Sequence, residues 1–311
     1  MKRITIVTPI YCEQDNIRKY YEATTAVIDK LPNYQWTILF VDDGSNDDSA
    51  HIIHELIDID DRIELIRFSR NFGKECALTA GVLETKNSDA IITIDADLQH
   101  PPDLIPAMLK LWEDGYPVVA TIRKSVESHS IFRKMGSSIY YSIMERVGGH
   151  HIIRNSTDFR LMDRIVAEEF ARLSERIQMF RGSIDWFGFK TAHLNFDASE
   201  RFSGEARYSY GKLFNLAINS ITSFSLWPLK ITGYLGIVIS LISLFLLILF
   251  IFINIYINEW YISPITLFVV FNTFLVGIVM VCLGLIALYI GNINNEVVNR
   301  PNYVIAERRF K

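Results

Sequence analysis

The amino-acid sequence predicts an α/β fold with a mainly parallel sheet, followed by an amphipathic helix and two transmembrane helices. Short β-rich runs alternate with helical patterns in the first third of the chain. Two long uncharged runs lie in the last third, and polar clusters follow three of the expected strands. A chain of 311 residues is long enough for one α/β domain with an appendage.

The alternation of β-rich and helical runs defines the first domain. We expect strands at residues 4–8, 36–41, 63–68 and 90–94, and helices at residues 16–31, 49–57 and 74–84. Such alternation is typical of βαβ units, in which the strands run parallel. The domain is expected to span residues 1–211, and its ligands should bind beyond the carboxyl ends of the strands.

The uncharged runs predict two membrane spans. Residues 231–258 and 260–295 contain no charged side chain, and each run exceeds the roughly 20 residues that cross a bilayer. We place the spans at 231–253 and 264–290, within a membrane region of 230–291. The connection at 254–261 has no Lys or Arg, whereas basic residues flank both spans. This bias predicts a multi-pass protein of the cytoplasmic (inner) membrane, with the α/β domain and a tail at 292–311 in the cytoplasm.

Two further segments have apolar residues at helical spacing. Residues 212–229 precede the first span, which favours a helix lying in the membrane interface, although an ordinary packing helix fits the same periodicity. Residues 131–147 are explained equally well by an interfacial helix or by core packing.

Composition excludes several other classes of protein. The net charge of −4 argues against a nucleic-acid partner, because binding to phosphate backbones normally requires a basic excess. The three cysteines, Cys12, Cys76 and Cys282, are scattered and support neither a disulfide framework nor a zinc site.

Polar clusters at residues 9–13, 42–45 and 95–99 follow the first, second and fourth expected strands. Neither common glycine-rich phosphate loop is present, so a bound nucleotide must be held in another way. Asp95 and Asp97 stand two residues apart and can present oxygens to Mg²⁺ or Mn²⁺, and Gln99 can add a neutral oxygen. The same spacing also occurs where aspartates only cap a turn or a helix.

The motifs at residues 7–13, 41–45, 69–74, 95–102, 158–162 and 181–182 together resemble glycosyltransferase family 2. Within that family the chain resembles the polyprenyl-phosphate glycosyltransferases, which include dolichyl-phosphate mannose synthases and prophage-type bacterial glucosyl transferases. The resemblance implies a GT-A (Rossmann-like) fold and an inverting transfer from a nucleotide-sugar to undecaprenyl or another polyprenyl phosphate.

The resemblance also implies residue roles. The nucleotide-sugar would be bound by Pro9, Tyr11, Glu13, Asp42, Asp43, Lys74 and Asp95. The metal ion, Mg²⁺ or Mn²⁺, would be held by Asp95, Asp97 and Gln99. Asp97 and Asp158 would be the catalytic residues, and Arg123, Arg133 and Ser137 would bind the acceptor phosphate.

Two departures from the family pattern concern fine sugar contacts and processivity. Cys12 replaces the usual Asn, and residues 155–157 precede Asp158 where a glycine is common. Residues 178–182 are similar to the Q-x-x-R-W motif of processive synthases but lack its Trp, and only two spans follow. We therefore expect one transfer per acceptor.

The donor and the partners are less constrained. UDP-glucose is favoured by the resemblance, and UDP-N-acetylglucosamine and GDP-mannose are alternatives. A non-catalytic membrane scaffold with a degenerate transferase fold is the rival from another class. The spans are compatible with a homo-oligomer.

Overall fold

The computed structural model describes residues 1–85, 87–123, 156–173, 180–197, 264–298 and 301–310, with five isolated positions between 234 and 245. Several predictions lie outside these residues: the helices at 212–229 and 131–147, most of the first span, the connection between the spans, and the acceptor residues Arg133 and Ser137. The chain forms an α/β unit, to which residues 301–310 belong, and a second unit that contains the long helix α10.

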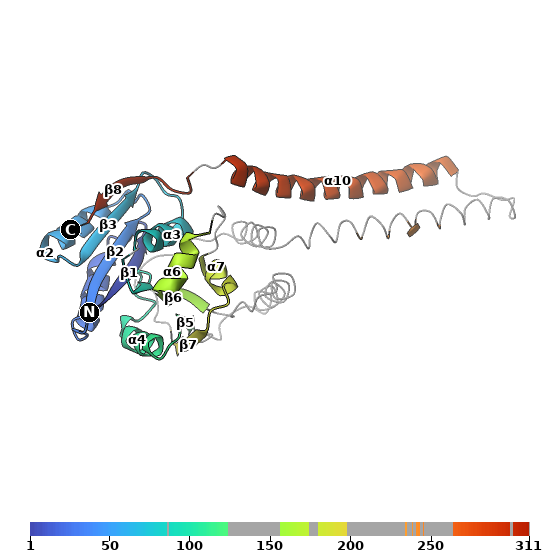
Figure 1. The fold of residues 1–311 in the computed structure, drawn as a ribbon. Coiled ribbons are helices and arrows are strands. Elements are labelled where there is room, and N and C mark those ends of the chain that lie inside the picture. The colour runs from blue at the N-terminus through green and yellow to red at the C-terminus, as the bar shows by residue number, and fades with distance from the viewer. Residues whose placement is uncertain are drawn as a thin grey trace. The chain divides into compact units, whose positions relative to one another are not determined.

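One eight-stranded sheet is the centre of the α/β unit (Figure 1). Its strands are β1 (Lys2–Ile10), β2 (Tyr34–Asp42), β3 (Ile63–Phe68), β4 (Ala90–Thr93), β5 (Val118–Arg123), β6 (Ser156–Asp163), β7 (Thr191–Phe196) and β8 (Ile305–Arg309). The helices of this unit are α1 (Ile17–Ile28), α2 (Ser49–Ile59), α3 (Lys74–Glu84), the short 3₁₀ helix η1 (Pro102–Leu104), α4 (Ile105–Glu113), α6 (Arg164–Ala171) and α7 (Phe180–Trp186).

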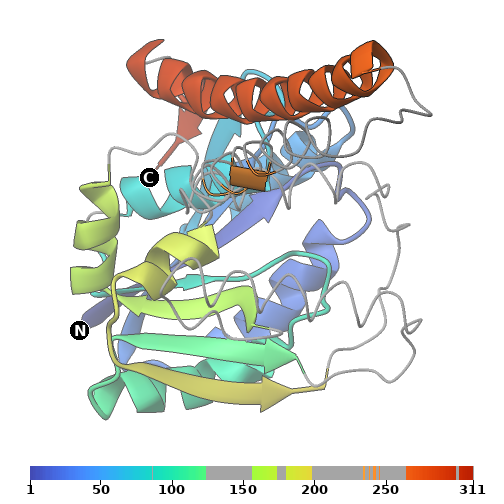
Figure 2. The same cartoon turned by 90° about the vertical axis from the view of Figure 1, so that its right-hand side faces the viewer.

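The strand order is β7-β5-β6-β4-β1-β2-β3-β8. The predicted α/β fold is confirmed, and the four strands expected from the alternation, β1 to β4, are parallel to one another where they pair. The sheet is nevertheless mixed, because β6 runs antiparallel to both β4 and β5. Figure 2 shows β5, β6 and β7 side by side.

Two hydrophobic cores cover the two faces of the sheet. Alternate residues of β1 explain the arrangement, since successive side chains of a strand point to opposite faces. Ile4 and Ile6 pack in the core that includes α1, α2 and α4. Val7 packs in the other core, which includes α3, α6 and α7. A sheet buried on both faces needs strands that are apolar throughout, and this is the pattern of residues 4–8 and 90–94.

Helix α3 packs unusually close to the sheet. A Cβ atom at Gly81 would lie 2.2 Å from Cγ1 of Val7, so only glycine permits this approach. The close contact fixes α3 over β1 and therefore fixes the position of Lys74, the first residue of the helix.

The C-terminal residues of the α/β unit form strand β8, antiparallel to β3 at the edge of the sheet. The Ser69 backbone N–H donates to the carbonyl of Val304 (2.9 Å). The Tyr303 ring stacks on Phe68 with 4.9 Å between ring centroids. Pairing with β8 covers an edge that would otherwise expose unpaired backbone groups.

Helix α10 (Pro264–Val298) begins at the predicted start of the second span and continues to Val298. Its segment Phe274–Gly291 has a mean hydropathy of 2.7 and no buried residues. Among the described residues, it is the one helix long and apolar enough to cross a membrane. The five described positions in the first predicted span are also helical.

Candidate active site

The three polar clusters meet at one edge of the sheet. In the parallel register, Ile10 lies beside Asp42 and Val7 beside Thr93, so β1, β2 and β4 all end there. Backbone hydrogen bonds continue the alignment past the strands: the Asp43 N–H donates to Ile10 O (2.8 Å) and the Ile94 N–H donates to Val7 O (3.1 Å). This edge is where an α/β sheet normally binds its ligand.

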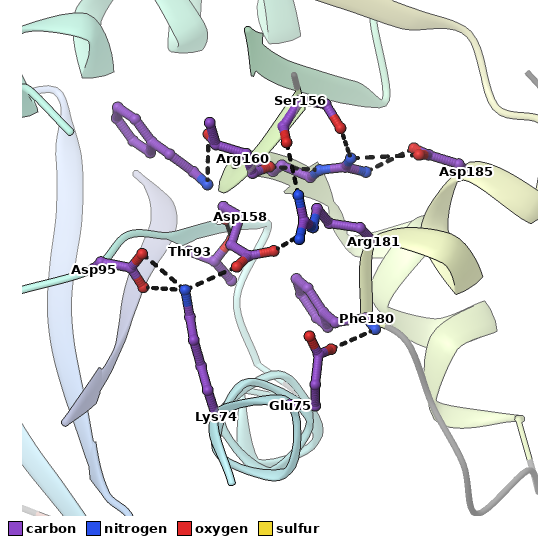
Figure 3. A network of polar contacts seen from close by, with 12 residues as sticks. Lys74, Glu75, Thr93, Asp95, Ser156, Asp158, Arg160, Phe180, Arg181 and Asp185 are labelled. Atoms are coloured by element: carbon purple, nitrogen blue, oxygen red, sulfur yellow. Dashed lines mark hydrogen bonds and ion pairs between the residues drawn. The ribbon is translucent and has the colours of Figure 1, made fainter. Parts of the chain in front are cut away.

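Lys74 lies between two carboxylates at this edge (Figure 3). Its Nζ is 2.7 Å from Oδ1 and 2.8 Å from Oδ2 of Asp95, and 2.8 Å from Oδ2 of Asp158. The two acidic neighbours raise the pKa of Lys74, although burial opposes them. The ammonium therefore stays charged and holds Asp95 and Asp158 close together.

Asp158 has a second cationic partner, because Arg181 Nε lies 2.9 Å from its Oδ1. Burial raises the pKa of Asp158, but the charges of Lys74 and Arg181 outweigh it and lower the pKa to about 2. The Thr93 hydroxyl also donates to the backbone carbonyl of Asp158. Asp158 is thus a fixed carboxylate, and its low pKa makes it a weak base at neutral pH.

Asp95, Asp97 and His100 form a group that fits a divalent metal ion, since one ligand atom from each lies within 4.8 Å of the others. The Leu98 backbone is left-handed (φ 57°), which turns the chain between these side chains. The Gln99 backbone N–H donates to Oδ1 of Asp97 (3.1 Å). Carboxylate oxygens with a neutral donor are a set that Mg²⁺ or Mn²⁺ accepts.

His100 is a member of this group that the sequence did not indicate. Its ring lies near the rings of Phe159 and Phe196, with centroids 5.7 and 5.6 Å away. Its Nδ1 is 3.6 Å from Oδ2 of Asp95. Burial lowers the pKa of His100, which favours the neutral imidazole that can act as a metal ligand.

The second polar cluster is buried and holds loops together. Asp42 is 0% exposed, and its carboxylate accepts from the Ser45 backbone N–H (2.9 Å) and lies 3.1 Å from Nε of Arg67. The Asp43 carboxylate accepts from the backbone N–H groups of Phe72 (2.6 Å) and Gly73 (2.8 Å). Burial raises the pKa of Asp43, against these two hydrogen bonds. Asp43 thereby anchors the loop that leads into Lys74.

The first cluster lies next to the second. The Cys12 backbone N–H donates to the Ser45 hydroxyl (2.9 Å), and Oε2 of Glu13 accepts from the Asn16 amide (2.6 Å). Pro9 is half-buried and Tyr11 is 38% exposed. The residues expected to line a nucleoside pocket are therefore brought together at one edge.

Comparisons with known proteins decide the family. The glycosyl transferase family 2 profile matches residues 5–171. Glycosyltransferase YkcC of Bacillus subtilis is 38% identical over 97% of this chain and 92% of its own length. The prophage bactoprenol glucosyl transferase homolog of Escherichia coli is 33% identical over 97% of this chain and 98% of its own length. The chain belongs to glycosyl transferase family 2.

Two further similarities accompany this result. The bactoprenol glucosyl transferase of Shigella phage SfX is 33% identical over 99% of this chain and 100% of its own length. Among solved structures, glucosyl-3-phosphoglycerate synthase from Mycobacterium tuberculosis is similar over 71% of this chain and 78% of that chain, with 15% identity and a TM-score of 0.48. This protein is therefore a family 2 glycosyltransferase with a GT-A-like α/β fold.

In this glycosyltransferase, two crossed ion pairs join β6 to α7. Arg181 on α7 reaches Asp158 on β6, while Arg160 on β6 reaches Asp185 on α7 (2.7 Å) (Figure 3). Arg160 is 0% exposed and also donates to the Thr157 carbonyl (3.1 Å) and the Ser156 hydroxyl (3.0 Å). The buried pair holds α7 in place, and α7 in turn presents Arg181 to Asp158.

Replacing Arg160 with Met should lower the free energy of unfolding by about 3–5 kcal/mol, because Asp185 would keep a buried charge with no cation beside it. Arg164→Met is the matched control. Arg164 pairs with Glu168 at 2.7 Å, but both side chains are about half exposed, so its loss should stay below about 1 kcal/mol. Urea unfolding of the detergent-solubilised chain measures both, and equal losses would contradict the structural role of Arg160.

The remaining predicted residues divide as follows. Arg123 ends β5, is half-buried and lies beside Phe196 of β7. Arg133 and Ser137 lie outside the described residues. Residues that the sequence did not single out for a role, Arg67, His100, Arg160 and Arg181, all contact predicted site residues or hold their elements. Arg181 and His100 stood inside the family motifs, which was the one signal for them.

Proposed function

We propose that this glycosyltransferase transfers one hexose, with glucose favoured, from a UDP-sugar to undecaprenyl phosphate or another polyprenyl phosphate. The supporting observation is the combination of a metal-compatible carboxylate edge with full-length similarity to relatives named bactoprenol glucosyl transferase. The product would be a lipid-linked sugar used to modify cell-envelope glycans. UDP-N-acetylglucosamine and GDP-mannose are the alternative donors.

The acceptor chemistry favours a direct displacement. A phosphate monoester has a second pKa near 6, so at neutral pH its oxygen is already largely an anionic nucleophile. No strong base is then required, which agrees with the low pKa of Asp158. Attack on the anomeric carbon from the side opposite the leaving diphosphate would invert the configuration. Asp158 would orient the reacting groups rather than remove a proton.

The donor would lie along the edge formed by the three polar clusters. Pro9, Tyr11, Glu13, Asp42 and Asp43 would line its nucleoside end, either directly or by fixing the loops around it. A divalent ion bound by Asp95, Asp97 and Gln99, with His100 within reach, would offset the charge that develops on the departing diphosphate.

The acceptor phosphate would be bound by Arg123, Arg133 and Ser137. Arginine suits this task because its planar guanidinium can donate two parallel hydrogen bonds to phosphate oxygens. We place the reaction at the cytoplasmic face of the cell membrane, because a lipid phosphate lies at headgroup level while the nucleotide-sugar is soluble. Helix α10 has the length and apolarity that membrane anchoring requires.

The test is an organic-phase transfer assay. Purified chain, Mn²⁺ or Mg²⁺ and undecaprenyl phosphate are incubated separately with labelled UDP-glucose, UDP-N-acetylglucosamine and GDP-mannose. We expect label to enter the organic phase with UDP-glucose, only when lipid and metal are both present. Transfer from another donor would replace glucose in the proposal, and no transfer from any of the three would refute it.

A further inference from the structure

The contacts of Lys74 raise a question of charge. Both oxygens of Asp95 lie within 2.8 Å of its ammonium, and the same carboxylate belongs to the metal-compatible group with Asp97 and His100. One carboxylate is thus offered to two cations. Two unit charges 4 Å apart repel by about 4 kcal/mol at an effective dielectric constant of 20, and the second charge of a divalent ion increases this repulsion.

The backbone keeps Lys74 in this position. It is the first residue of α3, whose close packing on β1 depends on Gly81. The preceding loop is held by Asp43, which accepts from the N–H groups of Phe72 and Gly73. Lys74 therefore cannot leave the edge without breaking this support, although its side chain can rotate away from Asp95.

A second contact gives the ammonium an alternative position. Oδ2 of Asp158 lies 2.8 Å from Nζ, so Lys74 can keep one anionic partner if Asp95 turns toward a metal ion. The negative charge of a nucleoside diphosphate would supply a further partner and would lie between the two cations. Metal and ammonium then become compatible at one site.

We propose that Lys74 is an internal counter-cation that keeps the metal affinity of the free enzyme low and makes tight metal binding depend on a nucleoside diphosphate. This inference rests on the proposed function, since it assumes that the Asp95–Asp97 edge binds a metal–diphosphate donor. It adds a binding order: Lys74 preorganises Asp95 and Asp158, and metal and nucleotide then bind together. By linkage, the nucleotide must also gain affinity from the metal by the same factor.

The test measures Mn²⁺ binding by electron paramagnetic resonance, with and without UDP or GDP, on the full-length chain in detergent. For the wild type we expect nucleotide to tighten Mn²⁺ binding by roughly 5- to 150-fold, the usual range of coupling between two ligands. Lys74→Met should bind Mn²⁺ alone more tightly than the wild type, and the gain from nucleotide should shrink at least about fivefold. Lys74→Gln provides a second neutral variant in case the Met variant does not fold.

Two controls make the result specific. Lys74→Arg keeps a cation and should retain most of the coupling. Lys110→Met removes an exposed lysine of α4 and should match the wild type. The inference is overturned if a folded Lys74 variant binds Mn²⁺ alone no more tightly than the wild type, or if wild-type Mn²⁺ binding is indifferent to both nucleotides.

The assay contains neither acceptor lipid nor sugar transfer, so it separates the two proposals. Coupling without transfer to lipid would leave the role of Lys74 intact and refute the proposed acceptor. Transfer to lipid without coupling would do the reverse.

Discussion

Asp97→Asn is expected to lower the rate of sugar transfer by about 1000-fold. An amide oxygen carries no charge, and the stabilisation that a bound metal ion gives to a leaving group amounts to several kcal/mol, or about one factor of ten for every 1.4 kcal/mol. Asp97 lies in the metal-compatible group with Asp95 and His100. The measurement is the initial rate of label entering the organic phase at saturating Mn²⁺.

Asp103→Asn is the matched control for Asp97. Asp103 is exposed, lies in η1 and is outside the metal-compatible group. It should keep the wild-type rate, and so exclude a general effect of removing an acidic side chain near the edge. An Asp97→Asn protein that transfers sugar within about tenfold of the wild-type rate would refute its role.

Asp158→Asn should lower the maximal rate of transfer by about 100-fold, with a smaller change in the KM for the donor. The amide would lose the ion pairs with Lys74 and Arg181, and a misplacement of about 1 Å at a reacting centre can cost this factor. Because the pKa of Asp158 is about 2, the wild-type rate should show no loss from its protonation between pH 5 and pH 8.

Asp114→Asn, at the exposed C-terminal end of α4, serves as the control for Asp158. Steady-state kinetics at several donor concentrations separate the maximal rate from KM. A fully active Asp158→Asn protein would remove Asp158 from the mechanism. A wild-type rate that instead rose with pH through a group assigned to Asp158 would identify it as a base, contrary to our account.

The α/β architecture could be predicted because its strands are buried on both faces. Residues 4–8 and 90–94 are apolar without interruption, which is the pattern of a central strand, and β1 and β4 occupy these positions. The same pattern does not record strand direction. The antiparallel insertion of β6 between β4 and β5 was therefore not predicted.

Strand β8 could not be predicted for a different reason. Its residues, Ile305–Arg309, are mostly charged and exposed, as is typical of an edge strand. Its partner β3 lies far away in the sequence, and nothing local indicates the pairing. The sequence predicted only a tail at 292–311.

The site was predictable in its carboxylates and not in its cations. Asp95 and Asp97 follow an apolar strand two residues apart, a spacing that itself suggests metal binding. Lys74 was assigned to the donor by resemblance, but its contact with Asp158 joins positions 84 residues apart. Arg160 and Arg181 likewise act across long sequence separations. Such pairs depend on the packing of the whole domain, which periodicity and motifs do not encode.

One measurement tests the central claim most directly: the simultaneous appearance of UDP and of lipid-linked hexose in the presence of Mn²⁺, with and without excess chelator. The account predicts equal amounts of the two products at every time point, and none of either once the metal is removed. UDP release without a glycolipid, or glycolipid formation that continues unchanged with the chelator, would contradict it.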